Sequence, residues 1–474
     1  MKIKQTVMGS AGYLGVVLCG LLLINGCVMG PDYKKPEVNL PGQFSGPAPE
    51  QPEPGAAEVS SQWWLQFNDP ELVHLVELAL EHNTDLLQAS ARIEQVEALL
   101  GQAKAAQLPN INLATDAARS RTSTTTMPGA GGTSNNFRAT GSISFELDLW
   151  GRVRRASEAV RAQLLATRYA REVVRQTVAG LVARNYFSLL TLDRQVALSR
   201  DILQSRVEEL RLLKLRSQYG VTGQLDLEQA ETARAEAALQ LREIERQRTL
   251  QSNQLGLLTG QPGIVISDSK SVRLAMPPVP PAGVPSRLLE RRPDVRQAEQ
   301  LLISANAQIG VAKAEMFPKL SLTALAGGES ADLATLLSSG SRIWTLGFGL
   351  GLPLFDGGRR LAETEQAKAR QVEVLAAYQG AVQSAFKDVA DALTNLQAAR
   401  ASQTYAEKRE LAALNALHLA QKRYESGYSG MLELLDAQRT ANSAQLQILS
   451  NLESQYSATV DLFKVLGGGW ASGS

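Results

Sequence analysis

The side chains that could perform catalysis or hold a metal ion are few and scattered in this chain. Its three histidines, at positions 74, 82 and 418, do not have the spacing of a metal-binding motif. The alternating glycines from Gly347 to Gly351 lie in an apolar run without the G-x-G-x-x-G pattern of a nucleotide loop. The segment 427–430 lacks the spacing of a serine nucleophile motif. We therefore predict no enzyme, no metal site and no cofactor, and an enzyme or binding protein is the weaker alternative.

One side chain, Cys27, is predicted to carry a covalent modification. A charged start is followed by an apolar run from about residue 7 to 24, which ends at Asn25-Gly26-Cys27. This pattern is typical of a secretory signal, and a transmembrane anchor is the alternative. The tetrad from Ile24 to Cys27 resembles a bacterial lipobox. Because Cys19 would leave with the signal, Cys27 is predicted to become the lipidated first residue of the mature chain, with a covalent lipid on its thiol.

The composition favours long helices over a compact enzyme core. The chain has 474 residues, 5% aromatic residues and a formal net charge of +1. Stretches rich in Ala, Gln, Leu, Glu and Arg are typical of helices that pack side by side. The near-neutral charge gives no reason to expect a nucleic-acid partner.

The chain contains an internal duplication. Residues 81–113 match 290–322 without gaps, at an offset of 209 (290 minus 81). The offset falls to 207 farther along, where Gly220 and Gly223 match Gly427 and Gly430. An offset that changes by only two residues over so long a stretch predicts two halves of the same architecture.

Each half is predicted to contain a helix, a strand, a loop, a second strand, a long helix, a turn and a final helix. In the first half these are a helix over 69–107, strands at 110–121 and 137–149 around a loop at 122–135, and helices at 152–218 and 223–259. In the second half they are a helix over 286–316, strands at 319–328 and 342–355, and helices at 359–426 and 430–466.

The lengths of the helices suggest how they stack. Each long helix would measure on the order of 100 Å. The helices 223–259 and 286–316 together match the length of 359–426, so we expect them to stack end to end along it. By the duplication, 430–466 would stack on 69–107. The segment 260–285 and both chain tails would then form an equatorial belt.

The strands predict a shared membrane pore. Each has the length of a tilted membrane-spanning strand. Four strands cannot close into a barrel, and open edges in lipid would leave backbone groups unpaired. More than two protomers are needed for an open lumen. The alternative is a pair of soluble hairpins packed on the helices.

Several motifs resemble those of one family, the TolC-like outer-membrane factors of the NodT/OprM type. The motifs are Cys27-x-x-x-Pro31-x-Tyr33-x-x-Pro36, Trp63-Trp64-x-x-Phe67, Asp69-Pro70-x-Leu72, Phe145 to Arg152, Arg291 to Val295, and Leu354 to Arg359. They cover essentially the whole mature chain.

The resemblance implies a mainly α protein with a transmembrane β-barrel. Three protomers, with four strands each, would share a 12-stranded barrel continuous with a coiled-coil α-barrel. It also implies a homotrimer in the cell outer membrane with a large periplasmic portion. A periplasmic adaptor (membrane fusion) protein, an inner-membrane pump of the RND type and outer-membrane lipid would be its partners. The expected function is passive efflux of drugs or toxic compounds, and a structural coiled-coil lipoprotein that spans the periplasm is the alternative.

The predicted divisions are 1–26 signal peptide, 27–68 lipidated extended segment, 69–260 first repeat, 261–285 equatorial linker, 286–467 second repeat and 468–474 tail.

The resemblance also implies where the channel would close. The matching motif begins at Tyr424, and it places Leu432 at an apolar constriction and Asp436 in an acidic ring, with Arg439 and Tyr424 tying neighbouring helices together. Without the family, a solvated surface position explains Asp436 equally well. The glycines of the helical turns, Gly220, Gly223, Gly427 and Gly430, terminate helices. They are also predicted to meet the adaptor.

Overall fold

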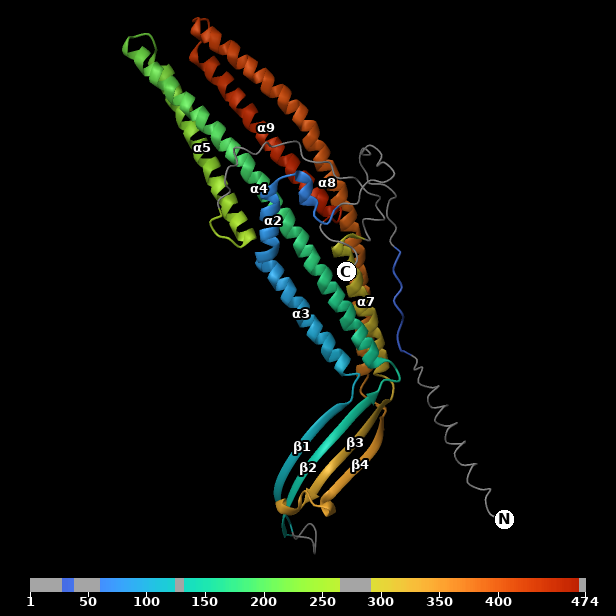
Figure 1. Ribbon diagram of the computed structural model, residues 1–474. Coiled ribbons are helices and arrows are strands. Elements are labelled where there is room, and N and C mark those ends of the chain that lie inside the picture. Colours follow the sequence, from blue (N-terminus) through green and yellow to red (C-terminus); the bar gives the residue numbers. More distant parts are fainter. Residues whose placement is uncertain (1–27, 38–59, 124–131, 265–290, 469–474) are drawn as a thin grey trace, which may run out of the picture. The chain divides into compact units, whose positions relative to one another are not determined.

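The computed structural model describes residues 28–37, 60–123, 132–264 and 291–468 (Figure 1). These residues form two units. The sheet unit comprises the described parts of 1–37, 92–168 and 297–379, and the helical unit those of 38–91, 169–296 and 380–474. The predicted signal peptide, Cys27, most of the 261–285 linker and nearly all of the C-terminal tail lie outside the described residues.

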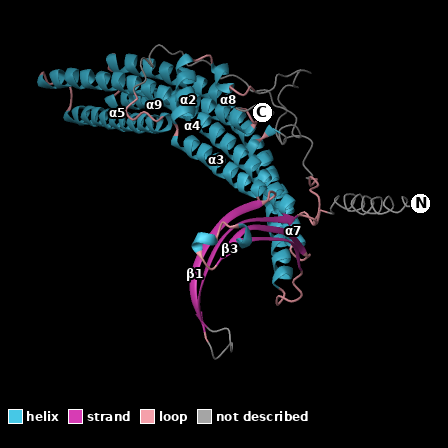
Figure 2. Ribbon diagram, turned by 60° about the horizontal axis from the view of Figure 1, so that its bottom comes forward, coloured by secondary structure: helices cyan, strands magenta, loops and turns pink. Residues whose placement is uncertain are grey.

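The sheet unit contains the four predicted strands in one antiparallel sheet, in the order β1-β2-β3-β4 (Figures 1 and 2). The strands are β1 (Asn110–Thr122), β2 (Gly132–Leu147), β3 (Lys319–Ser330) and β4 (Arg342–Gly351). The β1–β2 and β3–β4 hairpins come from the two halves of the chain. They are joined where β2 pairs with β3, with Phe145 opposite Leu322. Pairing between the two halves therefore makes a single sheet.

Several strand boundaries differ from the sequence prediction by a few residues, and the two largest differences have a physical reason. The stretch 122–135 was expected to be a loop, but Gly132 to Asn135 continue β2 and pair with β1, up to Gly132 opposite Thr122. Backbone hydrogen bonds do not depend on side-chain type, so the ladder extends through polar residues. At the other end, β4 stops at Gly351 instead of residue 355, because Pro353 has no N–H to donate to the ladder.

The two outer strands are exposed within the protomer, and β4 presents an apolar surface. All residues of β1 are exposed, and β4 is exposed along most of its length. Trp344 and Phe348, which point to one face of β4, are each 78% exposed. Neither β1 nor β4 has a second partner strand in the described part of the chain. The sheet thus ends in two open edges.

The helices account for most of the remaining described chain. They are α2 (Pro70–His82), α3 (Thr84–Ala105), α4 (Arg152–Gln218), α5 (Gln224–Thr259), α7 (Pro293–Ala314), α8 (Arg359–Glu425) and α9 (Met431–Val465). Both long helices agree with prediction to within one residue. No helix in the described ranges is both long and apolar enough to cross a membrane.

The predicted helix over 69–107 is in fact two helices, α2 and α3. Asn83 is extended between them, and its side-chain oxygen accepts hydrogen bonds from the N–H groups of Asp85 and Leu86. This is an N-cap, which begins a new helix. Sequence periodicity continues through the break, so only the capping chemistry of Asn83 could have indicated it.

In the helical unit the short helices meet within each half, so the predicted stacking partners are wrong. The Asn83 amide donates to the carbonyl of Leu258 at 3.0 Å, which brings the end of α5 to the start of α3. Arg292 donates to the carbonyl of Val465 at 3.3 Å, which brings the end of α9 to the start of α7. These two contacts occupy corresponding positions of the duplication. Each half therefore completes its own stack, whereas the lengths alone allowed partners to be exchanged between halves.

An aromatic core joins the segments that border the predicted belt. Trp63, in a short 3₁₀ helix (Trp63–Phe67), stacks on Phe463 of α9 at 5.5 Å between ring centroids. Leu255 and Leu258 of α5 belong to the same cluster. The described borders of the three belt segments thus meet in this core. Residues 28–37 of the amino-terminal tail are an exception to the prediction, because they belong to the sheet unit.

In the sheet unit, residues 28–37 form a strap against α4 and α7. Met29 donates to the carbonyl of Trp150 at 3.0 Å, and the Arg155 guanidinium pairs with Asp32 at 2.7 Å. A Cβ added to Gly30 of the strap would lie 2.5 Å from the Cα of Gly310 on α7. The strap therefore needs glycine at its crossing with α7.

We predict that Tyr186→Phe destabilises the helical unit. Tyr186 is fully buried on α4 and donates to Asp69 at 2.8 Å, and burial together with this bond raises the pKa of Tyr186, which keeps the hydroxyl a donor. The other oxygen of Asp69 caps α2. Loss of a hydrogen bond to a charged group costs roughly 1.5–3 kcal/mol, measured as a lower Tm in detergent.

Tyr219→Phe is the matched control, because Tyr219 is 83% exposed. Equal Tm values for the two variants would show that the Tyr186–Asp69 bond does not stabilise the fold.

Candidate functional site

The two helical turns of the helical unit have the same geometry. Gly220 and Gly427 adopt φ values of +72° and +77°. The following residues, Val221 and Tyr428, donate to the carbonyls of Arg216 and Arg423 at 3.0 and 2.9 Å. This is the Schellman arrangement, in which a glycine in the left-handed region ends a helix. The structural role predicted for these two glycines is confirmed.

The other two predicted glycines begin the return helices. Gly223 precedes α5 and Gly430 precedes α9, with φ values of −75° and −82°. Neither value requires glycine. Both positions leave the first turn of the helix without a side-chain cap. The turns also expose apolar side chains, including Val221 and Tyr428. Contact between these turns and an adaptor protein stays a prediction.

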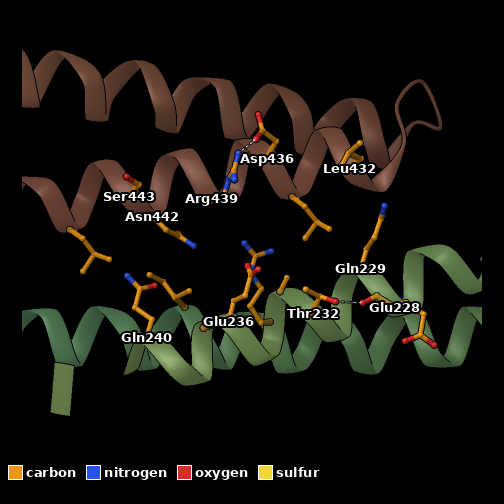
Figure 3. A pocket seen from close by; sticks show the side chains of 16 residues that line it. Glu228, Gln229, Thr232, Glu236, Gln240, Leu432, Asp436, Arg439, Asn442 and Ser443 are labelled. Carbon is orange, nitrogen blue, oxygen red and sulfur yellow. Dashed lines mark hydrogen bonds and ion pairs between the residues drawn. The ribbon is translucent and has the colours of Figure 1, made fainter. Parts of the chain in front are cut away.

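Three of the four predicted gate residues share one face of α9. Leu432, Asp436 and Arg439 line the same cavity, one helical turn apart (Figure 3). Asp436 and Arg439 form an ion pair of 2.7 Å on their own helix, with side chains 62% and 77% exposed. Leu432 is also exposed. The face thus presents an apolar side chain and a solvated, internally neutralised charge pair.

The cavity lies between α5 and α9 and has a volume of about 540 Å³. Figure 3 shows Gln229 and Thr232 of α5 facing the α9 residues across it. These two are the duplication counterparts of Asp436 and Arg439 (229 plus 207, and 232 plus 207). The two halves therefore direct equivalent faces into one space, but at these two positions only the second half carries a charge pair.

The fourth predicted residue, Tyr424, lies apart from this face. It packs against an apolar cluster that contains Leu210, Leu213, Met431 and Leu434. It lines a second cavity, of about 840 Å³, between α4 and the α8–α9 hairpin. The structure therefore brings Leu432, Asp436 and Arg439 together and separates Tyr424 from them.

A polar cluster that sequence reasoning missed lies between the two cavities. Arg206 of α4 lines both of them, although its side chain is only 7% exposed. Its guanidinium donates to Glu209 at 3.0 Å and to the side-chain oxygen of Gln438 on α9. Gln438 in turn donates to Glu209 at 3.4 Å. The duplication gave no signal, because alanines occupy positions 413 and 416, the counterparts of Arg206 and Glu209.

The remaining predicted site, Cys27, lies outside the described residues. The next residue, Val28, contacts Gly151 at the joint between β2 and α4: a Cβ on Gly151 would lie 2.9 Å from the Val28 side chain. Within the described ranges there is no group of three or more His, Cys, Asp or Glu side chains that could hold a metal ion.

A sheet with two open edges and exposed apolar residues on β4, together with long paired helices that end in glycine turns, is typical of the class of outer-membrane channel subunits. The model of a protein family described as "Outer membrane efflux protein" matches residues 75–261 and 284–468. These two ranges begin 209 residues apart (284 minus 75), the offset of the duplication. The chain belongs to the outer membrane efflux protein family.

Individual relatives match over nearly the whole chain. The outer membrane protein OprJ of Pseudomonas aeruginosa is 35% identical, with 95% of each chain covered. The solvent efflux pump outer membrane protein SrpC of Pseudomonas putida is 34% identical, with 95% of this chain and 97% of that protein covered. The crystal structure of the open state of the Neisseria gonorrhoeae MtrE channel has a TM-score of 0.83 and 32% identity, and covers 94% of this chain and 98% of its own. This chain is accordingly an outer-membrane channel component of an efflux system.

We predict that Gly427→Ala strains the second turn. An L-residue in the left-handed region costs roughly 1–2 kcal/mol, and the Schellman bonds hold this backbone conformation. The Tm in detergent is expected to fall. Gly430→Ser is the control, because its φ of −82° suits serine, which can also cap α9. A larger loss of stability for Gly430→Ser than for Gly427→Ala would refute this account of the turn.

Proposed function

We propose that three copies of this chain form a passive efflux duct through the outer membrane. Each copy would contribute four strands to a 12-stranded barrel and its helices to a periplasmic tunnel. One observation supports this most strongly, namely the four-stranded sheet with apolar residues exposed on β4 and with two open edges.

The open edges are the physical reason for the assembly. In hydrocarbon, each unpaired backbone N–H or C=O costs several kcal/mol, so β1 of one copy must pair with β4 of the next. Two copies would give eight strands, whose interior is filled by side chains, whereas twelve leave space for a lumen.

The cavity face of α9 is proposed as the gate. With three copies around an axis, Leu432 would form an apolar ring and Asp436 an acidic ring. A ring of carboxylates attracts cations and repels anions. Here the Asp436–Arg439 pair partly cancels that field, since the two side chains are bonded to each other on α9.

The partners and the cargo follow from the family. We propose that the exposed turns at Gly220 and Gly427 meet a periplasmic adaptor, which connects the duct to an inner-membrane pump of the RND type. Drugs, solvents and other toxic small molecules are the proposed cargo, since SrpC is named as part of a solvent efflux pump. The duct itself performs no reaction.

A lipid on Cys27 is proposed as a second membrane anchor. The strap places Val28 beside Gly151, close to where β2 ends at Leu147. The acyl chains would therefore start near one end of the strands. We predict that the mass of the mature wild-type chain exceeds that of the polypeptide from residue 27 by several acyl groups. Cys27→Ser should lack this excess in intact-mass spectrometry. Equal masses, after allowance for the substitution itself, would rule out the lipid.

We predict that the purified protein runs as a detergent-resistant trimer with measurable conductance in planar bilayers. Asp436→Ala combined with Arg439→Ala should raise that conductance, because it removes charged side chains and their hydration from the narrowest part of the duct. A structural coiled-coil lipoprotein without transport would give no conductance at all.

The matched control is Glu243→Ala with Arg246→Ala on α5. This ion pair has the same i,i+3 spacing, a distance of 2.6 Å and similar exposure. Its removal should leave the conductance unchanged. If the Asp436 and Arg439 substitutions also have no effect, α9 does not hold the gate.

A further inference from the structure

We propose that Arg119, Arg121 and Arg342 form a basic girdle around the outside of the barrel, which binds the phosphate groups of lipids in the outer leaflet of the membrane. The inference rests on the proposed barrel and adds a ligand class for its outer surface. None of the three arginines belongs to the gate, the helical turns or the strap.

The registers of the sheet show which side chains share a face. Leu322 lies opposite both Phe145 and Phe348, so these three side chains are on one face, which we call the apolar face. Ile143 of β2 is on the same face and lies opposite Ile111 of β1. Side chains alternate along a strand. The odd-numbered residues of β1 and the even-numbered residues of β4 therefore belong to the apolar face, and these include the three arginines.

The two faces of the sheet differ in charge. The four strands contain eight charged residues, of which only Arg119, Arg121 and Arg342 lie on the apolar face. Every strand carboxylate lies on the opposite face, so none shares the face of the three arginines. That opposite face carries the five remaining charged residues, Asp116, Arg138, Glu146, Lys319 and Glu329.

The three arginines also lie at one end of the sheet. The chain order puts every link to a helix at the end where β1 and β3 begin, and both hairpin turns at the other end (Figure 1). Arg119 and Arg121 are near the end of β1, and Arg342 is the first residue of β4, so all three are at the hairpin end. With the helices in the periplasm, as proposed, this end faces the outer leaflet.

The apolar series on β2 gives the depth of the membrane along the sheet. From Phe137 to Leu147 the apolar face of β2 carries no polar side chain, over ten residues (147 minus 137). At a rise of about 3.3 Å per residue, this series is about 33 Å long. A tilt of about 40° reduces it to roughly 25 Å across the membrane, which is the height of the apolar band of a membrane barrel.

Both edge strands change from apolar side chains to arginine at the outer limit of this band. Arg119 and Arg121 lie opposite Asn135 and Thr133, which precede the apolar series of β2. On β4, Arg342 directly precedes the apolar alternation. Since β1 of one copy would pair with β4 of the next, the arginines of two copies would line the same junction between protomers. The trimer would thus carry three such sites at headgroup depth.

A lipid phosphate is the group that this arrangement fits. A guanidinium presents a planar fork of N–H donors that can bond two phosphate oxygens at once. At the edge of the hydrocarbon, the aliphatic part of an arginine stays with the acyl chains while its charged end reaches the headgroups. A soluble polyanion would meet the same charges but would gain nothing from the apolar band beside them. A lipid satisfies both features.

The test measures lipid binding to full-length trimers by native mass spectrometry. The probe is lipid A, a glycolipid that carries phosphate groups, and the comparison is the same glycolipid after these phosphates are removed. Each basic residue near an anionic surface contributes roughly fivefold to binding. The triple variant Arg119→Gln, Arg121→Gln and Arg342→Gln should therefore bind lipid A about a hundredfold more weakly. Its binding of the dephosphorylated glycolipid should equal that of the wild type.

The matched control compares Arg342→Gln with Arg138→Gln. The first should weaken lipid A binding about fivefold. The second removes the same group from the same sheet, but Arg138 lies opposite Asp116 and Glu329 on the other face. Lipid A binding should then stay at the wild-type level. Arg342→Lys keeps the charge without the fork, so its affinity should fall between those of Arg342→Gln and the wild type.

The outcomes separate the girdle from the duct. A wild type that forms no conducting trimer overturns the proposed function itself. Conducting trimers that bind both glycolipids equally overturn the girdle alone, as does an equal loss of binding in Arg138→Gln and Arg342→Gln. Displacement of lipid A by millimolar inorganic phosphate would show a site for free anions and also overturn the proposal. If the triple variant does not assemble, Arg342→Gln decides, because this side chain is exposed.

Discussion

An unpaired strand edge cannot face hydrocarbon, and this constraint governs the architecture of the protein. The protomer has two such edges, on β1 and β4, together with an exposed apolar surface. Adding strands within one chain could have satisfied the edges, but the duplication supplies only two hairpins. In the proposed assembly, identical copies pair edge to edge, so that one kind of strand pairing satisfies every edge. The opening inside that ring would then be a consequence of how the edges are satisfied.

The duplication is preserved at some contacts of the helical unit and lost at others. The helix junctions are repeated faithfully, with Asn83 and Arg292 each bonded to the carbonyl of the helix that ends beside it. The paired turns are also repeated, down to their left-handed glycines. The cavity between α5 and α9 departs from this symmetry, since Gln229 and Thr232 face the charged Asp436 and Arg439. The halves thus agree at the helix junctions and turns and differ at the proposed gate.

The sequence predicted the regular elements well and their partners poorly. Strand alternation and helix periodicity are local, so four strands and the long helices followed directly from them. The break at Asn83 was not predicted, because a cap replaces a few backbone hydrogen bonds without disturbing the apolar pattern of the sequence. The stacking partners were predicted wrongly, because equal helix lengths cannot distinguish one helix end from its duplicate in the other half. The motif placed three of the four predicted gate residues on one face of one helix, and the structure brings those three together. Arg206 was not predicted, because its contact is with a residue 232 positions away (438 minus 206).

The crossing of Gly30 over Gly310 has a consequence for the order in which the chain matures. The two glycines are 280 residues apart (310 minus 30), and a Cβ on either would collide with the backbone of the opposite segment. Contacts of such high sequence separation form late, since the intervening chain must be ordered first. During synthesis and export the amino-terminal end therefore has no docking place until the second half has emerged and coiled. Under the proposed lipidation of Cys27, the modifying enzymes would meet this end while it is still free, and its docking on α7 would mark a protomer ready for the proposed assembly.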